Sequence, residues 1–482
     1  MRRRDFLAMA GALPLAGAGK AAAELAADPQ RPQYHLLPPA NWMNDPNGPI
    51  YWDGKYHMFY QYNPNGAYWG DMHWGHAISD DMVHWKHLPV ALAPTPGGPD
   101  KDGVFSGCAV IDNGTPTVVY TGVNPETQCI ATSSGDLTKW TKYPRNPVIA
   151  APPAGLAVTG FRDPAVWKEG DTWLMALGSG FRDKGGAVLL YESKDLRHWN
   201  YLHPLATGHM KPGASAKDPV DSGEMWECPD FFPIGDKHLL ILSTERVVKY
   251  LLGRYQDRQF VPETMGGIDH GLYYAARTMT NTGDRRILWG WLTEGRSAAA
   301  QKAAGWSGVM SLPRELKLYG AQVQMRPAAE VESLRGKKLG ADAVGDCLEV
   351  QAEIDTQGAA QAGLKLRADP DSSEQTLVYY DRLQRLICVD RSRASRNPAA
   401  DRSMQTGPFL LGRGEPLRLH IFLDGSVVEI FANDRFCLSA RVYPEGPHST
   451  GLGLYSTGNA AKMASLQAWQ MRPISPDRLT SL

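Results

Sequence analysis

Short apolar runs separated by tight turns recur along most of the chain. Five of these turns place a glycine next to a polar residue, between runs rich in β-branched and aromatic positions. They are YWDGKYHMFYQY, IDNGTPTVVYTG, WKEGDTWLMALG, PIGDKHLLILST and NTGDRRILWGW. A turn of this kind between two apolar runs is a strong β-hairpin signal, so the first two thirds of the chain are predicted to be built from hairpins.

The hairpin turns recur at a nearly regular spacing. The turn glycines are Gly54, Gly114, Gly170, Gly235 and Gly283. They lie 60, 56, 65 and 48 residues apart, a period that fits one four-stranded blade. A second block, Ser-x-Asp followed by an apolar residue and ending in Trp, recurs as SDDMVHW (79–85), SGDLTKW (134–140) and SKDLRHW (193–199). A sandwich would not repeat this block at matching spacing, so residues 32–325 are predicted to form a five-bladed β-propeller.

The last third of the chain has a different pattern. LHIFLDGSVVEIF (419–431) is an Asp-Gly hairpin whose strands alternate, as a sheet with one buried face requires. Segments of this kind predict a β-sandwich over residues 347–475, with 326–346 as the linker. The predicted fold class is all-β, with a five-bladed β-propeller followed by a C-terminal β-sandwich.

The charge balance argues against two classes of partner. The 482 residues include 50 basic and 51 acidic side chains, a net charge of −1. This balance provides no field that would recruit nucleic acid or an anionic membrane, and neither is expected as a partner. The 14 Trp and 19 Tyr fit a large β core, and exposed aromatic rings are good platforms for sugars.

The N-terminus has the pattern of an export signal. MRRRDFLAMAGALPLAGAG begins with basic residues, continues with an apolar stretch rich in Ala and Gly, and is followed by small residues. The two arginines before Phe6 and Leu7 resemble a bacterial twin-arginine signal. Residues 1–27 are therefore predicted to be a signal peptide, and the protein is expected to be periplasmic or extracellular.

Cysteine and histidine usage does not indicate a metal or cofactor. None of the six cysteines forms a C-x-x-C pair, and they are expected to be buried free thiols. Four histidines cluster in HWGHAISDDMVHWKH without a second ligand cluster: His73, His76, His84 and His87. No metal and no cofactor is predicted.

Polar residues fall at the same register in four of the predicted blades. Asp45 lies nine residues before Gly54, Ser106 eight before Gly114, Asp163 seven before Gly170, and Glu227 eight before Gly235. Each would start the first strand of its hairpin. If those strands are innermost, the four side chains converge on one mouth of the central channel. The acids also precede proline in NDPNG, RDPAV and ECPDF, and proline holds its predecessor in extended geometry.

Several acids in one aromatic-lined funnel suit the hydrolysis of a glycosidic bond. One carboxylate attacks the anomeric carbon or activates water, while a second must be protonated to help the leaving oxygen depart. Arg162 beside Asp163 is expected to keep that carboxylate ionised. Glu227, next to Trp226 and near Pro229, is expected to lie in a drier place that favours its protonated form. This predicts Glu227 as the proton donor, with Asp45 and Asp163 as the ionised pair.

Ordered motifs over nearly the whole chain resemble glycoside hydrolase family 32, the β-fructosidases. They include WMNDPNG, FYQYNP, WGDMHWGHA, FSG, FRDP, WECPDFFP, DHGLYYAARTM, LWGW, GWSGVMSLPREL and DGSVVEIFAND. The resemblance implies Asp45 as the nucleophile, Glu227 as the acid/base and Asp163 as the transition-state stabiliser, with retention through a covalent fructosyl-enzyme. It also implies a propeller with a sandwich, and substrate contacts from Asn44, Gln61, Trp69, Phe105, Ser106, Arg162 and Trp306.

One departure from the family bears on the substrate. Plant members that prefer sucrose carry an Asp in the segment matching STERVVKYLLG, where this chain has Ser243, Thr244 and Glu245. We therefore expect an exported exo-β-fructosidase that releases fructose from levan- or inulin-type fructans and from sucrose. The alternatives are a fructosyltransferase, a sucrose-preferring invertase, a sugar-binding propeller lectin, and an inverting propeller glycosidase acting on arabinan.

Overall fold

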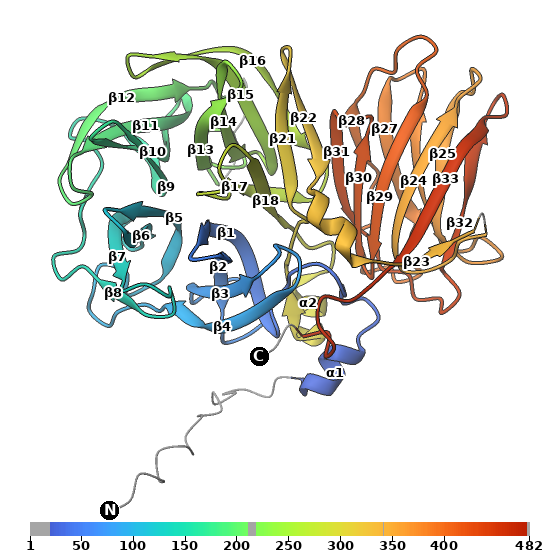
Figure 1. Ribbon diagram of the computed structural model, residues 1–482, viewed down its shortest axis with the longest axis horizontal. Coiled ribbons are helices and arrows are strands. Elements are labelled where there is room, and N and C mark those ends of the chain that lie inside the picture. The colour runs from blue at the N-terminus through green and yellow to red at the C-terminus, as the bar shows by residue number, and fades with distance from the viewer. Residues whose placement is uncertain (1–19, 211–217, 341, 480–482) are drawn as a thin grey trace, which may run out of the picture.

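Five sheets, each built on four antiparallel strands, surround a common axis, and a two-sheet sandwich lies beside them (Figure 1). The computed structural model describes residues 20–210, 218–340 and 342–479. The predicted fold class is confirmed as all-β, a five-bladed β-propeller with a C-terminal β-sandwich. The helical elements of the described chain are short: α1 (Ala22–Ala27), α2 (Ala298–Ala304) and the 3-10 helix η1 (Ala329–Leu334).

The first four blades are each made of four consecutive strands. The first two blades contain β1 (Asn41–Trp52), β2 (Lys55–Asn63), β3 (His73–Ser79), β4 (Trp85–Leu92), β5 (Val104–Asp112), β6 (Thr115–Gly122), β7 (Thr127–Ser133) and β8 (Trp140–Lys142). The next two contain β9 (Val158–Glu169), β10 (Thr172–Phe181), β11 (Gly185–Ser193), β12 (Trp199–Thr207), β13 (Glu227–Ile234), β14 (Lys237–Thr244), β15 (Val247–Gln256) and β16 (Gln259–Asp269).

The fifth blade is interrupted in sequence and closes the ring. Its strands are β17 (Tyr273–Thr278), β18 (Arg286–Leu292), β21 (Arg314–Tyr319) and β22 (Gln322–Pro327), with α2, β19 (Trp306–Ser307) and β20 (Val309–Met310) inserted before β21. The innermost strands β1, β5, β9, β13 and β17 contact one another in that order, and β17 contacts β1 again. In addition, β19 pairs in parallel with the start of β1, so a segment inserted in the fifth blade is hydrogen-bonded directly to the strand that carries Asp45.

The Ser-x-Asp…Trp block forms the turn between the third and fourth strands of the first three blades. In the first, Asp81 accepts hydrogen bonds from the backbone N–H groups of Val83 and His84. The apolar residue of the block adopts a left-handed backbone and is buried, with φ of 71° at Met82, 58° at Leu137 and 61° at Leu196. The block is therefore a turn that buries an apolar side chain in the blade.

The sandwich consists of two antiparallel sheets. One contains β23 (Arg335–Leu339), β33 (Lys462–Met471), β24 (Cys347–Asp355), β29 (Leu417–Asp424), β30 (Val427–Ala432) and β31 (Phe436–Arg441). The other contains β28 (Gln405–Pro408), β27 (Leu386–Arg393), β26 (Gln375–Asp381), β25 (Gln361–Ala368) and β32 (Gly451–Thr457). The segment 326–346, predicted as a linker, contains η1 and β23, because the RGKKL stretch pairs with β33 as an edge strand.

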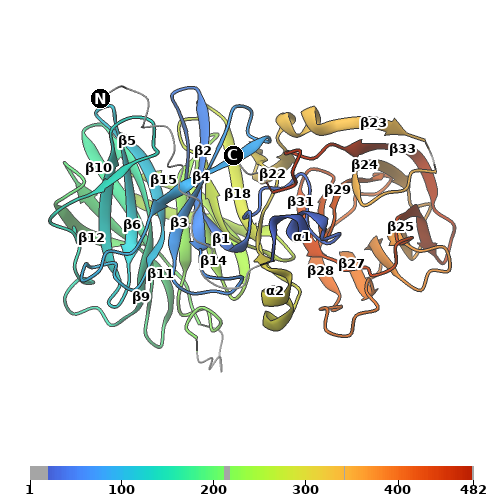
Figure 2. The same cartoon turned by 90° about the horizontal axis from the view of Figure 1, so that it is seen from below.

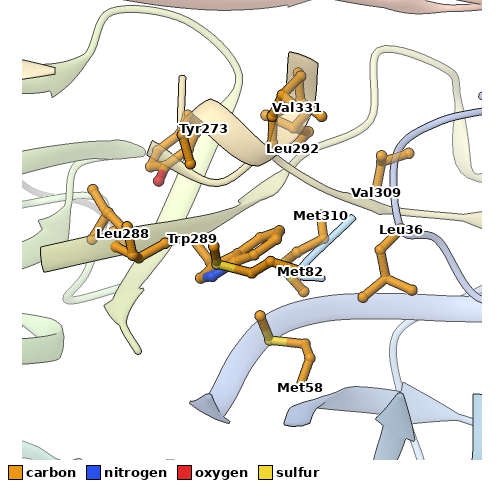
Figure 3. Close-up of a cluster of buried hydrophobic side chains, with 14 of the residues drawn as sticks. Leu36, Met58, Met82, Tyr273, Leu288, Trp289, Leu292, Val309, Met310 and Val331 are labelled. Atoms are coloured by element: carbon orange, nitrogen blue, oxygen red, sulfur yellow. The ribbon is translucent and has the colours of Figure 1, made fainter. Parts of the chain in front are cut away.

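One cluster of buried apolar side chains and one buried network of charges span the boundary between the two domains. Figure 3 shows Met58 of the first blade, Trp289 of the fifth and Val331 of η1 in a single cluster. At the same boundary, Arg314 on β21 donates to Asp269 of the propeller at 2.9 Å and to Glu429 of the sandwich at 2.6 Å. Charges buried in this way are costly unless they are paired, so the network fixes how the domains meet.

The residues just after the predicted signal core pack onto the folded body. Seen from below (Figure 2), α1 and α2 lie at the junction of the two domains. Leu25 of α1 is buried against Gly305, and Asp28 accepts a hydrogen bond from the indole of Trp306 at 2.8 Å. Residues 20–27 pack on the folded body, and residues 1–19 lie outside the described residues, so the signal boundary at residue 27 stays a prediction.

Among the described residues, no helix is long and apolar enough to cross a membrane. All six cysteines are buried and unpaired, as expected from their spacing.

Candidate active site

Each innermost strand carries a β-bulge near the same end, and the bulges position the site. The pairing shifts at Asn44–Asp45 in β1, at Ser106 in β5, at Asp163–Pro164 in β9, at Cys228–Pro229 in β13 and at Ala275–Ala276 in β17. A bulge re-aims side chains relative to regular pleating. Three of these residues have left-handed backbones that are unfavourable for L-residues: Asp163 (φ 64°), Cys228 (φ 47°) and Ala275 (φ 53°).

The bulges open onto a cavity of about 960 Å³ at one mouth of the propeller channel. Nine of the ten site residues predicted from the sequence line this cavity: Asn44, Asp45, Gln61, Trp69, Phe105, Ser106, Arg162, Asp163 and Glu227. Trp69 is 60% exposed at the rim and meets Phe105 edge to face, with ring centroids 5.9 Å apart. This aromatic wall presents apolar surface to a sugar ring that enters the pocket.

The carboxylate of Asp45 is held from both sides. Ser106 donates its hydroxyl to Oδ2 at 2.6 Å, and the amide of Asn44 donates to Oδ1 at 2.9 Å. Asn44 is itself oriented by the indole N–H of Trp42, which donates to the amide oxygen at 2.7 Å. Donors on both oxygens fix the direction of this carboxylate, which is a property that a nucleophilic carboxylate needs.

Asp163 lies at the floor of the pocket and is 3% exposed. Its Oδ2 accepts a hydrogen bond from the backbone N–H of Cys228 at 3.0 Å, and its own N–H donates to Thr121 at 3.1 Å. Burial, the largest influence, and the nearby charges of Glu227 and Asp45 raise the pKa of Asp163 to about 7, although Arg162 acts in the opposite direction. The floor therefore keeps a proton near neutral pH when the pocket is empty.

Arg162 binds Glu227 rather than Asp163. Its Nε and Nη2 donate to one oxygen of Glu227 at 3.1 and 2.8 Å, and the hydroxyl of Tyr274 donates to the other at 2.7 Å. The sequence-based expectation that Arg162 keeps Asp163 ionised was wrong, because the guanidinium is hydrogen-bonded to Glu227 and the pKa of Asp163 is raised. The bulge at Asp163 directs that carboxylate down to the floor, while the adjacent guanidinium projects across to β13.

Trp306 is the one predicted substrate-binding residue that does not line the cavity. Its side chain is fully buried, its indole N–H is bound to Asp28, and the guanidinium of Arg296 lies 4.2 Å from its ring centroid. Because β19 pairs with the start of β1, Trp306 supports the wall behind Trp42 instead of facing the pocket.

Other lining residues were not predicted from the sequence: Trp42, Asp218, Val220, Asp221, Arg246, Gly271, Leu272, Tyr274, Trp291, Thr293, Glu294, Gln301 and Asp401. Tyr274 could have been found, because it lies nine residues before Gly283, the same offset as Asp45 before Gly54. Asp401 belongs to the sandwich loop between β27 and β28 and reaches the pocket through a hydrogen bond from its N–H to Gly295. No local pattern marks such an interdomain contact.

The segment used above to infer substrate preference contributes a different residue to the pocket. Ser243 and Thr244 are buried, and the hydroxyl of Ser243 accepts from the N–H of Ala275. Arg246 lines the cavity instead, where it is paired with Asp221 through two hydrogen bonds of 3.0 and 2.9 Å. Arg246 and Asp221 therefore form the wall at this side.

The channel mouth brings together Asp45, Asp163 and Glu227. Arg162 is hydrogen-bonded to Glu227, and hydroxyl and amide donors bind Asp45. This arrangement defines a glycosidase-type site. The chain matches the family models for the glycosyl hydrolases family 32 N-terminal domain over residues 35–327 and the C-terminal domain over 317–470. It therefore belongs to glycosyl hydrolase family 32.

Several relatives match over most of their length. A protein from Zymomonas mobilis named sucrose-6-phosphate hydrolase is 35% identical over 501 residues, covering 94% of each chain. A levanase from Bacillus subtilis is 34% identical and covers 92% of this chain and 71% of its own. The crystal structure of fructan 1-exohydrolase IIa from Cichorium intybus superposes with a TM-score of 0.82 at 28% identity, covering 92% of this chain and 98% of its own.

Replacing Asp163 with Asn tests the buried proton. The carboxyl of Asp163 keeps its proton to about pH 7 in the folded protein but loses it near pH ~3.9 when unfolded. The wild type therefore loses stability as pH rises through this window. Asn has no proton to lose, so the melting temperature of Asp163→Asn relative to wild type should increase from pH 4 to pH 8, while activity falls by about 100-fold or more. A melting-temperature difference that stays constant with pH would contradict the assignment.

Proposed function

We propose that the protein is a retaining exo-β-fructosidase that releases terminal fructose from β-fructans and from sucrose. The observation that carries this proposal is the division of labour among the three carboxylates. Asp45 is held as an acceptor by Ser106 and Asn44, whereas Glu227 sits between a cation and a tyrosine hydroxyl. One carboxylate is built to attack, and the other to exchange a proton.

The reaction has two displacements. Asp45 attacks the anomeric carbon of the fructosyl unit and forms an ester, while Glu227 gives its proton to the departing oxygen. Glu227 then takes a proton from water, which attacks the same carbon and releases Asp45. Two inversions at one carbon give retention.

Asp163 binds the fructosyl hydroxyls in this scheme. In the empty pocket, burial favours a proton on Asp163. Hydroxyl groups that donate to its carboxylate stabilise the ionised form, so substrate binding favours the carboxylate that holds the fructosyl unit.

The floor of the pocket supports action at chain ends. The thiol of Cys228 lies 3.5 Å from carboxylate oxygens of both Asp45 and Asp163 and is 3% exposed. A floor of buried side chains is what a pocket that binds a terminal fructosyl unit requires, and it supports exo action as part of this proposal. The kinship with a levanase and a fructan exohydrolase supports fructans as substrates, and a transferase would differ only in which acceptor meets the fructosyl-enzyme.

We also propose that the protein is exported. The support is the sequence of the N-terminus, MRRRDFLAMAGA, with its basic start and its resemblance to twin-arginine signals.

Leaving-group dependence tests the role of Glu227. Glu227→Gln should lose about 1,000-fold in kcat/KM on sucrose and much less on an aryl fructoside whose leaving group needs no proton. The measurement compares kcat/KM on both substrates, since that constant reports the first displacement. Equal losses on the two substrates would remove Glu227 as the acid. Oligofructosides that accumulate from sucrose with little free fructose would instead favour the transferase.

The charge of the pocket predicts selectivity for neutral sugars. Among the described lining residues the carboxylates are Asp45, Asp163, Asp218, Asp221, Glu227, Glu294 and Asp401. The two lining guanidiniums, Arg162 and Arg246, are each already bound to a carboxylate. A phosphorylated sugar would meet repulsion here, so kcat/KM for sucrose should exceed that for sucrose 6-phosphate by about tenfold or more. The opposite ranking would show that this chain acts as the name of its Zymomonas relative describes.

A further inference from the structure

Glu126 lies outside the pocket but is connected to its acid. It occupies the turn between β6 and β7 in the second blade. Its Oε1 accepts from Nη1 of Arg162 at 2.8 Å, and its Oε2 accepts from the backbone N–H of Phe161 at 2.5 Å. Both carboxylate oxygens of Glu126 are therefore hydrogen-bonded to the two residues that precede Asp163.

Arg162 is divided between two carboxylates. Nη1 faces Glu126, whereas Nε and Nη2 face Glu227. Burial would lower the pKa of Arg162, but the charges of Glu227 and Glu126 raise it, so the guanidinium stays ionised. Because the guanidinium is planar and its N–H groups are fixed in direction, anchoring one end by Glu126 sets the direction in which the other end meets Glu227.

The second carboxylate also changes what Arg162 does to the acid. A guanidinium paired with Glu227 alone would hold that residue as a carboxylate, which cannot donate a proton. Glu126 offsets the positive charge of Arg162. The guanidinium then acts on Glu227 mainly by orienting it through two hydrogen bonds.

The groups that face Glu227 come from four of the inner strands. They are Asp45 on β1, Arg162 and Asp163 on β9, Cys228 on β13 and Tyr274 on β17. Each of these lines or floors the pocket. Glu126 is a charge behind them that does not itself line the pocket.

We propose that Glu126 is a positioning residue that acts through Arg162 to orient Glu227 and to offset the positive charge that the guanidinium brings to that acid. This inference rests on the proposed role of Glu227 as acid/base.

The test is the pH profile of Glu126→Gln. Gln keeps the length and one acceptor oxygen but removes the charge, so the alkaline limb of kcat/KM for sucrose should move down by about one pH unit. At neutral pH, kcat/KM of Glu126→Gln should fall about tenfold on sucrose and stay within about twofold of the wild-type value on the aryl fructoside. Glu192→Gln is the matched control, because it removes one charge from the Glu192–Arg258 pair away from the pocket and should leave the profile unchanged.

A second variant distinguishes the effect of the charge of Glu126 from the effect of its side-chain length. Glu126→Asp keeps the charge but shortens the side chain, so it should lose rate on sucrose with the alkaline limb close to that of wild type. A Glu126→Gln profile that superimposes on wild type, or equal losses on both substrates, would overturn the proposal. Glu227→Gln is measured alongside. If its kcat/KM does not depend on the leaving group, the proposed function has failed. If it does depend on the leaving group but the pH profile of Glu126→Gln is not shifted, only the role of Glu126 is defeated.

Discussion

Mutual repulsion among Asp45, Asp163 and Glu227 is the constraint on which the site depends. Three carboxylates in one pocket cannot all be ionised at low cost unless cations or hydrogen-bond donors compensate them. Each receives a different compensation: donors for Asp45, burial with a retained proton for Asp163, and the guanidinium of Arg162 for Glu227. Three identical charges thereby acquire three chemical roles.

The propeller supplies this arrangement through its innermost strands. The ring brings five strand ends to one mouth, and a bulge in each strand turns its side chains toward that mouth. The left-handed backbones at Asp163 and Cys228 are unfavourable by themselves, and the closed ring keeps them in place. The sandwich adds Asp401 to the rim, and the buried contacts of Arg314 at the domain boundary hold it there.

The sequence was sufficient for the architecture and for the identity of the three acids, because both follow from repetition. The turn at Gly54 and its four equivalents define the blades, and an acid seven to nine residues before such a turn lies on an innermost strand near the channel. The cation or hydrogen-bond donor that pairs with each carboxylate could not be predicted in this way. The chain neighbours Arg162 and Asp163 point to different strands because a bulge separates them, and Trp306 is buried by an N-terminal segment distant in sequence. Bulges and interdomain contacts produce no periodic pattern in the sequence from which they could be predicted.

The most direct test of the account is to trap the fructosyl-enzyme. Glu227→Gln should be fructosylated rapidly by a donor with an activated aryl leaving group, but it lacks the base that recruits water for the second displacement. Mass spectrometry of the acid-quenched protein should then show one fructosyl unit on the peptide that contains Asp45. Continued release of fructose without an adduct, or an adduct on another residue, would contradict the central claim that Asp45 is the nucleophile.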